Sequence, residues 1–277
     1  MLVYLNGKYV PHEDARISVD DRGFLFADGV YEVVRVYRGR LFRMGDHVER
    51  MRRGLDALRI GFDGVDGLGT IAERLLAENG LDEATVYIQV TRGASPRAHA
   101  FPTPTPAPTV YVATRPFGGY PPEYAEQGVT TITVPDTRWS RCDVKSVALL
   151  PNVLANQQAK EAGAFEALFV RDGVVIEGSL SNLLGVIDGT VVTYPACNYI
   201  LPGITRAVTL ELARALGIPV REGPIRLEEL HRVEELFLSG TTTEVMPIAR
   251  VDGRLIGDGR PGPITRRLRE AFRELTA

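Results

Sequence analysis

Lysine is rare in this chain, so the few lysines that remain are candidates for chemistry. Of the 32 lysines and arginines, only Lys8, Lys145 and Lys160 are lysines. An arginine cannot lose its proton in a protein or form a Schiff base, whereas a lysine in a partly apolar pocket can do both. A position that keeps lysine in such a sequence is therefore one at which an amine could be needed.

Two of the three lysines are expected at the surface. Lys8 follows an Asn-Gly pair between two short apolar runs, a pattern typical of a two-residue hairpin turn with its charge in water. Lys160 is expected in the last turn of a helix that ends at Gly163, where a cation interacts favourably with the helix dipole.

Lys145 differs because it lies inside an apolar run, residues 143–150, that we expect to be buried. Burying an amine without a partner is costly, so a specific role must compensate for it. The sequence leaves two interpretations open. Lys145 is either a reactive amine or one half of a buried ion pair with a neighbour such as Asp143.

The other chemistry-bearing residues match no familiar metal or hydrolase pattern. The histidines and cysteines lack metal-ligand spacing, so no metal site is expected. The chain also has no G-x-S-x-G nucleophile turn, phosphate loop or dinucleotide fingerprint. The residues considered were His12, His47, His99, His231, Cys142 and Cys197.

Two polar turns could bind an anion. Residues 201–205 lead directly into a predicted helix, whose first N–H groups could hold a phosphate. Residues 239–243 follow a predicted strand and offer hydroxyl and amide donors. Taken singly, each turn is better explained as a capped helix or an ordinary turn than as an anion site.

The elements that must position these residues form two patterned halves, with short strands and amphipathic helices in both. In the first half, Asp46 is expected to cap a helix whose apolar face ends at Leu58. In the second half, short strands joined by turns suggest a barrel or a curled sheet. The predicted strands are 2–4, 9–10, 29–37, 85–91, 110–114, 130–134, 167–170, 174–176, 183–187, 190–194 and 236–238, and further helices are predicted at 71–81, from 151, at 204–216 and at 264–275.

Composition bounds the setting of these elements. The 277 residues, 44% of them apolar, predict an α+β protein with a domain at residues 1–114, a linker at 115–122 and a larger domain at 123–277. A net charge of −3 with interspersed signs gives no nucleic-acid surface, and no run is long enough to span a membrane. Without an apolar signal region or paired cysteines, a cytoplasmic protein is expected.

Several motifs occur together in an order that resembles the fold-type IV, or class IV, aminotransferases that use pyridoxal 5'-phosphate. This resemblance covers nearly the whole chain and implies a small N-terminal domain and a larger C-terminal domain with a pseudo-barrel β core. The motifs are Asp21–Phe24, Gly29–Glu32, His47–Arg50, Glu177–Asn182, Gly203–Arg206 and Thr241–Pro247.

The resemblance implies a role for several single residues. Lys145 would carry the cofactor as an internal aldimine and shuttle the substrate proton, and Glu177 would pair with the ring nitrogen. Leu201 resembles the apolar residue behind the cofactor ring, although an ordinary core leucine explains it equally well. The residues implied to hold the phosphate are Arg50, Ile204, Thr205 and Thr241.

The residue chemistry agrees with these roles. A Schiff base needs a neutral amine, and burial near other cations lowers the pKa of a lysine such as Lys145 towards that state. The cofactor ring withdraws electrons while its nitrogen is protonated, which a carboxylate such as Glu177 favours. The freed Lys145 amine could then take the α-proton of the substrate and return it to the cofactor.

Residues 91–102 resemble the loop with which the D-amino acid aminotransferases of this family bind the substrate carboxylate. Arg97 and His99, two residues apart, can present donors on one side of an extended segment, and Tyr31 and Thr242 would also contact substrate. In the family this loop reaches the active site of a second subunit, so a homodimer with composite sites is implied. A solvent-exposed proline-rich loop is the plain alternative.

The expected activity is ping-pong transfer of an amino group from a D-amino acid, such as D-alanine or D-glutamate, to 2-oxoglutarate or pyruvate. Leu180 and Gly240 depart from the family pattern, with a bulkier side chain and without a hydroxyl respectively, and put the preferred D-amino acid in doubt. An (R)-amine transaminase or aminodeoxychorismate lyase on the same scaffold is the alternative, and a non-catalytic binding protein is a more remote one.

Overall fold

The computed structural model describes residues 1–277, which fall into two compact units. The N-terminal unit comprises Met1–Gly118 together with Val144–Leu149, and the C-terminal unit comprises Gly119–Asp143 and Leu150–Ala277. The segment that contains Lys145 therefore packs in the N-terminal unit. This differs from the division expected from the sequence, which assigned all of residues 123–277 to one domain, because a short segment can leave one unit and pair with a strand of the other.

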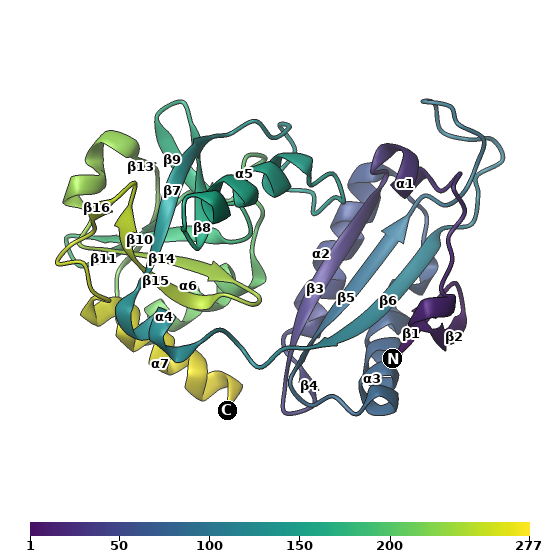
Figure 1. Ribbon diagram of the computed structural model, residues 1–277, viewed down its shortest axis with the longest axis horizontal. Coiled ribbons are helices and arrows are strands. Elements are labelled where there is room, and N and C mark those ends of the chain that lie inside the picture. The colour runs from purple at the N-terminus through teal and green to yellow at the C-terminus, as the bar shows by residue number, and fades with distance from the viewer. The chain divides into compact units, whose positions relative to one another are not determined.

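The N-terminal unit is built on a six-stranded antiparallel sheet with strand order β2-β1-β6-β5-β3-β4 (Figure 1). Along β5, buried residues such as Val86 and Ile88 alternate with half-buried ones such as Tyr87. This alternation places one face of the sheet in the core. The strands are β1 (Leu2–Leu5), β2 (Lys8–Pro11), β3 (Gly29–Tyr37), β4 (Arg40–Leu41), β5 (Ala84–Thr91) and β6 (Thr109–Pro116).

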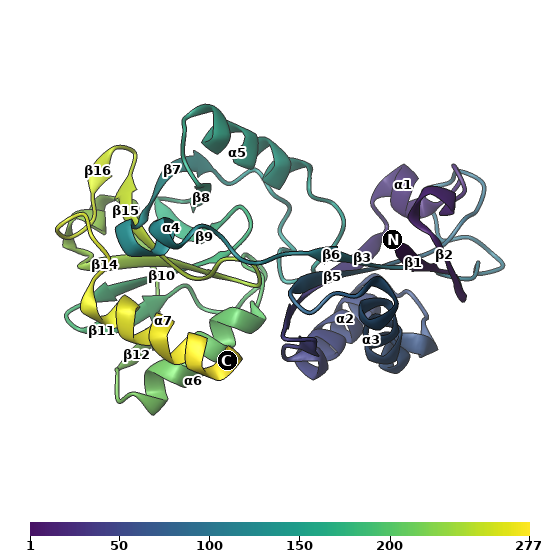
Figure 2. The ribbon, with the colours of Figure 1, turned by 60° about the horizontal axis from the view of Figure 1, so that its bottom comes forward.

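Helices α2 (Met44–Leu58) and α3 (Leu68–Asn79) lie on the same face of this sheet (Figure 2). Their apolar residues, among them Met51 and Leu75, join the strand residues in one hydrophobic core. A short helix, α1 (Arg22–Phe26), precedes β3 in the chain.

Two local predictions for this unit have different outcomes. The hairpin before Lys8 is confirmed, because Asn6 and Gly7 have φ angles of 48° and 88°, as a tight hairpin turn requires. The Asp46 cap is wrong. Helix α2 begins at Met44 after Arg43 in a left-handed conformation, and no side chain caps it, so Asp46 lies inside the first turn, where its charge still suits the helix dipole.

The C-terminal unit contains a closed ring of six strands in the order β10-β14-β15-β7-β8-β9, with β9 pairing back to β10. The expected pseudo-barrel is therefore confirmed. The ring strands are β7 (Val129–Pro135), β8 (Glu166–Arg171), β9 (Val174–Gly178), β10 (Asn182–Ile187), β14 (Glu235–Gly240) and β15 (Glu244–Val251). Short strands extend the sheet: β11 (Thr190–Thr193), β12 (Val220–Glu222), β13 (Ile225–Arg226) and β16 (Arg254–Leu255).

Helices surround this ring. Leu168, Leu183 and Leu236 contribute to the main apolar core of the unit, and each is almost completely buried. No helix of the chain is both long enough and apolar enough to span a bilayer. The helices of the unit are α4 (Pro122–Gln127), α5 (Leu150–Glu161), α6 (Ile204–Ala215) and α7 (Pro263–Thr276).

Candidate active site

Lys145 is held by backbone pairing to the start of β3. Ser146 forms an antiparallel bridge with Val30, and the N–H of Tyr31 donates to the Lys145 carbonyl at 3.0 Å. The half-buried Lys145 Nζ lies 4.2 Å from the centre of the Tyr31 ring. The ion pair considered from the sequence does not form, because Asp143 pairs instead with Arg141 at 2.9 Å. Lys145 thus has an aromatic neighbour and no carboxylate partner.

A buried ion cluster lies on the core face of the same strand. The Glu32 carboxylate accepts hydrogen bonds from Arg50 Nε and Nη2, each at 2.7 Å, and contacts His47 Nδ1 at 2.7 Å. Burial alone would raise the pKa of Glu32, but Arg50 and His47 outweigh it and lower the pKa to about 2. Glu32 is therefore a permanent anion that fixes the direction of the Arg50 guanidinium.

His47 is held in its neutral form. Burial lowers its pKa, and the positive charges of Arg50 and Lys145 lower it further, against the opposing effect of Glu32. The His47 and Lys145 groups are thus close enough to influence each other electrostatically. The neutral imidazole adds no positive charge beside the lysine amine.

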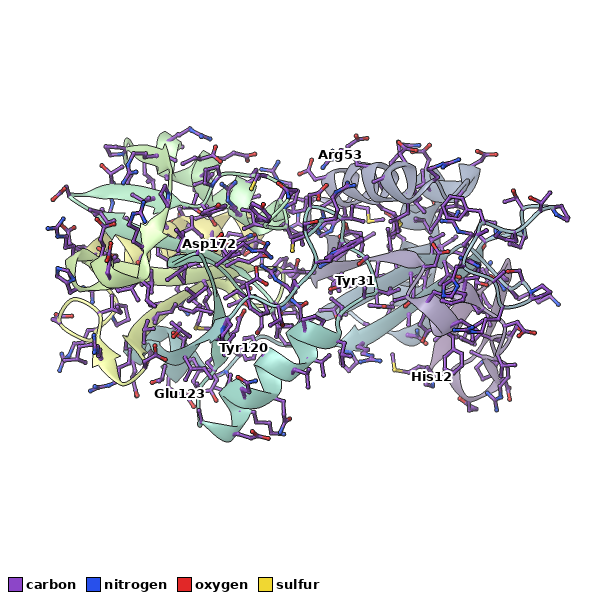
Figure 3. All side chains as sticks on the ribbon, turned by 90° about the horizontal axis from the view of Figure 1, so that it is seen from above. His12, Tyr31, Arg53, Tyr120, Glu123 and Asp172 are labelled. Atoms are coloured by element: carbon purple, nitrogen blue, oxygen red, sulfur yellow. The ribbon has the colours of Figure 1, made fainter.

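Strand β3 also places Tyr31 opposite to Glu32, because successive side chains of a strand point to opposite faces. The Tyr31 ring, labelled in Figure 3, stacks on Tyr87 of β5 with ring centres 5.7 Å apart. Burial raises the pKa of Tyr87 to about 12, so this phenol stays protonated. The hydroxyl of Tyr87 donates to Gln89 at 2.6 Å.

In the C-terminal unit, Glu177 is the last residue but one of β9, and Asn182 is the first residue of β10, across a tight hairpin. They pair with each other across β9 and β10, and the Gly178 N–H donates to the Ser181 carbonyl at 2.8 Å. Asn182 also pairs with Ser239 of β14 and donates from Nδ2 to the Leu201 carbonyl at 2.9 Å. Asn182 therefore joins three segments that are far apart in the sequence.

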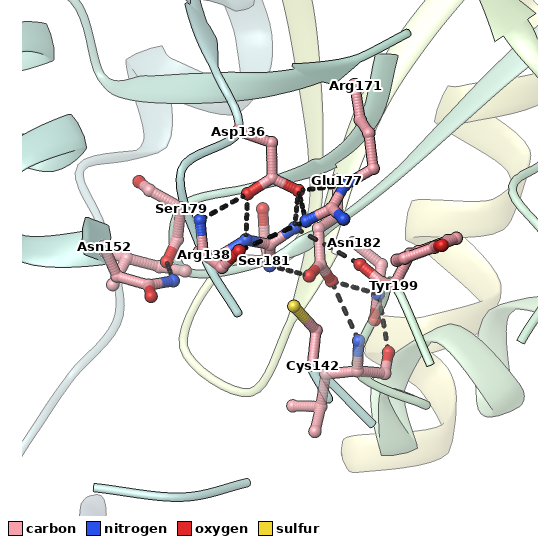
Figure 4. A network of polar contacts seen from close by, with 12 residues as sticks. Asp136, Arg138, Cys142, Asn152, Arg171, Glu177, Ser179, Ser181, Asn182 and Tyr199 are labelled. Carbon is pink, nitrogen blue, oxygen red and sulfur yellow. Dashed lines mark hydrogen bonds and ion pairs between the residues drawn. The ribbon is translucent and has the colours of Figure 1, made fainter. Parts of the chain in front are cut away.

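Three donors of the chain contact the buried Glu177 carboxylate (Figure 4). Arg138 donates to one oxygen, while Leu201 N and Asn182 Nδ2 donate to the other at 3.2 Å each. Burial raises the pKa of Glu177 to about 7, even though Arg138 opposes this rise. A carboxylate has about four acceptor positions, so Glu177 can accept one further N–H.

Arg138 is shared with a second buried carboxylate, that of Asp136. It donates to both Asp136 oxygens at 2.8 and 3.0 Å, and Arg171 pairs with Asp136 from another side at 2.9 Å (Figure 4). Burial lowers the pKa of Arg138, but Asp136 and Glu177 more than reverse this and raise it. The cluster therefore keeps Arg138 charged beside Glu177.

The start of α6 has the features of an anion site. Gly203 is the residue before the helix, and no side chain caps the first turn, which contains the buried residues Ile204 and Thr205. A β-carbon on Gly203 would collide with the Asn182 side chain, so only glycine allows this close approach. Uncapped N–H groups at a helix start bind phosphate or carboxylate groups.

The turn after β14 contains the last of the predicted site residues, Thr241 and Thr242. Gly240 pairs with Glu244, so the turn between them consists of Thr241, Thr242 and Thr243. The first two are half-buried and the third is buried. Thr242 shares a side-chain hydrogen bond with Tyr120. The preceding Ser239, through a 3.2 Å contact of its hydroxyl with Thr209, ties this turn to α6.

The predicted carboxylate loop belongs to the N-terminal unit. Arg97 and His99 are both exposed, and both pack against the ring of Phe26, at 5.2 and 5.5 Å from its centre. The structure thus brings Lys145, Tyr31, Arg50, Arg97 and His99 into the N-terminal unit. It brings Glu177, Leu201, Ile204, Thr205, Thr241 and Thr242 into the C-terminal unit.

Sequence reasoning missed several charged residues that support these groups. Glu32 could have been found, because it is a carboxylate on the core-facing side of an otherwise apolar strand. Arg138 and Asp136 lie in an irregular segment with no such signal. Glu166 begins β8, and its carboxylate accepts from Leu180 N at 2.7 Å and Ser181 N at 3.1 Å; burial raises its pKa to about 7.

These features can be compared with known proteins. Residues 29–251 match the family model for class IV amino-transferases, and the chain belongs to this family.

Among curated proteins, the chain is 42% identical over 271 residues to D-alanine aminotransferase of Staphylococcus epidermidis, with 98% of this chain and 96% of the relative covered. Among solved structures, Escherichia coli branched-chain amino acid aminotransferase has a TM-score of 0.92 and 29% identity, covering 100% of this chain and 94% of that one. The branched-chain amino acid aminotransferase from T.th. with pyridoxamine 5'-phosphate has a TM-score of 0.91 and 30% identity, covering 99% of this chain and 93% of that one.

Proposed function

We propose that this protein is a pyridoxal 5'-phosphate-dependent aminotransferase that moves the amino group of a D-amino acid, such as D-alanine or D-glutamate, to 2-oxoglutarate or pyruvate. The observation that carries the proposal is the 42% identity, over nearly the full length of both chains, to a D-alanine aminotransferase. The proposed site residues are supported by the family model and by the chemistry of the groups described above.

The residues present fit this cofactor. Arg50 with its fixed guanidinium, the uncapped start of α6 at Ile204 and Thr205, and the Thr241 turn would hold the phosphate. Glu177 has one acceptor position left for the protonated ring nitrogen. Leu201, whose N–H and carbonyl are both used by Glu177 and Asn182, would pack behind the ring.

When bound, the cofactor supplies a ring that withdraws electrons from the substrate α-carbon and carries the amino group between two half-reactions. Lys145 would bind it covalently through Nζ, and no ion pair has to be broken first. Once substrate replaces this bond, Lys145 Nζ would take the α-proton and later return a proton. The neutral His47 imidazole and the Tyr31 ring are the groups described beside that amine.

Substrate recognition would rest on Arg97 and His99, which would bind the α-carboxylate, together with the Tyr31 and Thr242 hydroxyls. Both loop residues are exposed in a single chain, which suits a loop that completes the site of a second subunit in a homodimer. Cys142 and Cys197 are both unpaired, which suits a reducing cytoplasm.

The test is a spectroscopic donor screen. The purified holoprotein should be yellow, and D-alanine without an acceptor should bleach it, whereas L-alanine should not. Lys145→Ala should lose both the covalent cofactor signal and turnover. A wild-type protein that stays colourless with added pyridoxal 5'-phosphate would refute the cofactor, and bleaching by an (R)-amine but not by D-alanine would favour the amine transaminase instead.

A further inference from the structure

The segment before β3 is hydrogen-bonded to residues 91–102, the loop that is proposed to bind the substrate carboxylate. Backbone hydrogen bonds of 2.9 to 3.1 Å join α1 and its neighbours to the start of the loop. The three bonds run from Arg22 N to Gly93 O, from Ser95 N to Asp20 O and from Arg92 N to Asp28 O. The start of the loop is therefore fixed by main-chain contacts, while Arg97 and His99 lie beyond them.

Arg22 of α1 then fixes the part of the loop that contains His99. Its buried guanidinium donates to the carbonyls of Ala98 at 2.6 Å, His99 at 3.4 Å and Ala100 at 3.4 Å. One planar group thus binds three successive peptide carbonyls. The rigid fork of an arginine can do this, whereas the single ammonium of a lysine cannot match its geometry.

Asp28 neutralises Arg22 and links it to a second arginine. It pairs with Arg22 at 2.8 Å and with Arg92 at 2.7 and 2.9 Å. Burial would raise the pKa of Asp28, but the two arginines lower it, so the carboxylate remains charged. Arg92 also lies 3.8 Å from the centre of the Phe101 ring, at the far end of the loop.

Phe26, at the end of α1, contacts both predicted carboxylate donors. The Arg97 guanidinium lies 5.2 Å from the ring centre, the His99 ring 5.5 Å from it, and Arg22 4.8 Å from it. An exposed arginine without such a contact samples many rotamers, and ordering it on binding costs entropy. The Phe26 ring restricts Arg97 and His99 before any ligand arrives.

We propose that Arg22 and Phe26 are positioning residues that hold Arg97 and His99 in the geometry that binds a substrate carboxylate. This inference rests on the proposed function, because it assumes that Arg97 and His99 meet the α-carboxylate. Arg22 and Phe26 act through the loop and not on the reacting atoms. Their loss should therefore weaken the binding of carboxylate substrates and leave proton transfer at Lys145 intact.

The decisive variant is Phe26→Leu, which keeps an apolar side chain and removes the aromatic face. KM for D-alanine and 2-oxoglutarate should rise by about 3- to 5-fold, with kcat within about twofold, as expected for loss of a cation–π contact. Phe24→Leu is the matched control, because Phe24 lies on the same helix with 70% of its surface exposed. It should leave both constants unchanged, and sedimentation should show the same assembly for all three proteins.

Two further arms separate positioning from a general structural role. In an Arg97→Ala background, Phe26→Leu should raise KM less than it does in the wild type, because only His99 is left for the Phe26 ring to position. At saturating D-alanine without an acceptor, bleaching of the cofactor should proceed at the wild-type rate in Phe26→Leu, because proton transfer at Lys145 is unaffected. Arg22→Lys should raise KM by about 10-fold or more, since three carbonyls lose their common donor.

An unchanged KM in Phe26→Leu, an undiminished effect in the Arg97→Ala background, or a fall in kcat alone would each overturn the inference. If Arg22→Lys does not fold, Phe26→Leu still decides. A wild-type protein that does not turn over D-alanine refutes the proposed function itself. Normal wild-type turnover with an insensitive Phe26→Leu refutes only the role of Arg22 and Phe26.

Discussion

Each of the two units buries a carboxylate beside an arginine, yet the pKa values of these two carboxylates are shifted in opposite directions. In the N-terminal unit, Arg50 donates two hydrogen bonds to Glu32, and the pKa of Glu32 falls to about 2. In the C-terminal unit, Arg138 divides its donors between Asp136 and Glu177, and Asp136 also repels charge on Glu177, whose pKa is about 7.

The difference teaches how one kind of ion pair can serve two purposes. The two hydrogen bonds from Arg50 and the contact with His47 make Glu32 a fixed anion that orients the Arg50 guanidinium. Burial raises the pKa of Glu177, and an arginine that it shares with Asp136 does not cancel this rise, so Glu177 can attract and share the proton of a ring nitrogen. Predictions that compare matched substitutions in the two units test this distinction.

Glu177→Gln should have the largest effect and should act on the reaction rate. We expect kcat to fall roughly 10³-fold, because a neutral partner no longer keeps the ring nitrogen protonated. The dissociation constant of the cofactor, measured by fluorescence titration, should change far less, since the phosphate contacts remain. A variant that keeps wild-type kcat would show that the basic carboxylate is not needed.

Arg138→Met should have the largest effect on stability. It leaves Glu177 without its cation and Asp136 with Arg171 alone, and removing one partner of a buried ion pair costs about 3–5 kcal/mol. Denaturant unfolding measures this loss. Arg141→Met is the control, because the exposed Arg141–Asp143 pair should contribute only about 0–1 kcal/mol. Equal losses in the two variants would contradict the buried cluster.

Glu166→Gln should change the pH dependence of stability. The pKa of Glu166 is about 7 in the folded protein, above its ordinary value of 4.5, so its contribution is present below pH 4.5 and is lost as pH rises through 7. Between pH 4.5 and pH 8, the unfolding free energy of the wild type should fall by about 3 kcal/mol more than that of the variant. Glu161→Gln, at an exposed site, should follow the wild type.

Glu32→Gln should act on cofactor affinity and not on rate. Arg50 loses a charged partner, a contact that contributes about 2 kcal/mol, so the dissociation constant of the cofactor should rise about 10- to 100-fold. At saturating cofactor, kcat should stay within about threefold. The control is Glu49→Gln, on the exposed side of α2, which should bind cofactor normally. A loss of kcat without a loss of cofactor affinity in Glu32→Gln would contradict the role assigned to Glu32.

Leu180→Ser should have the smallest effect. Leu180 lies in the Glu177–Asn182 hairpin with 65% of its surface exposed, so unfolding free energy should change by at most about 0.5 kcal/mol. The ratio of kcat/KM between a small and a large D-amino acid should shift by about fivefold. Gly240→Ser is a less specific test of substrate preference, because its β-carbon would lie 3.3 Å from atoms of Ser181 and Thr243 and would disturb the packing there.

The sequence predicted the elements better than the support of the site. Strand β3 was predicted with its observed ends, because its β-branched and aromatic residues favour a strand, and the hairpin at Gly7 followed from local turn chemistry. The contact of Lys145 with β3 was not predicted. It depends on pairing between residues more than 100 positions apart, which no local pattern encodes.

The same limit applies to the charged clusters. Motif resemblance named Arg50 and Glu177, but the partners that set their chemistry, such as Arg138, come from irregular segments or distant strands. Helix α2 shows a smaller error of the same kind. Its start is set by a left-handed Arg43 and not by the acidic residue that a sequence would choose as a cap.

The N-terminal unit is assembled from two separate stretches of the chain, since Val144–Leu149 returns to it after the C-terminal unit has begun. A single recombination point between Gly118 and Gly119 would combine the start of β3 from one parent with the Lys145 segment of the other. Chimeras within the family therefore need two further junctions, on either side of residues 144–149, to inherit the amine together with the sheet that holds it.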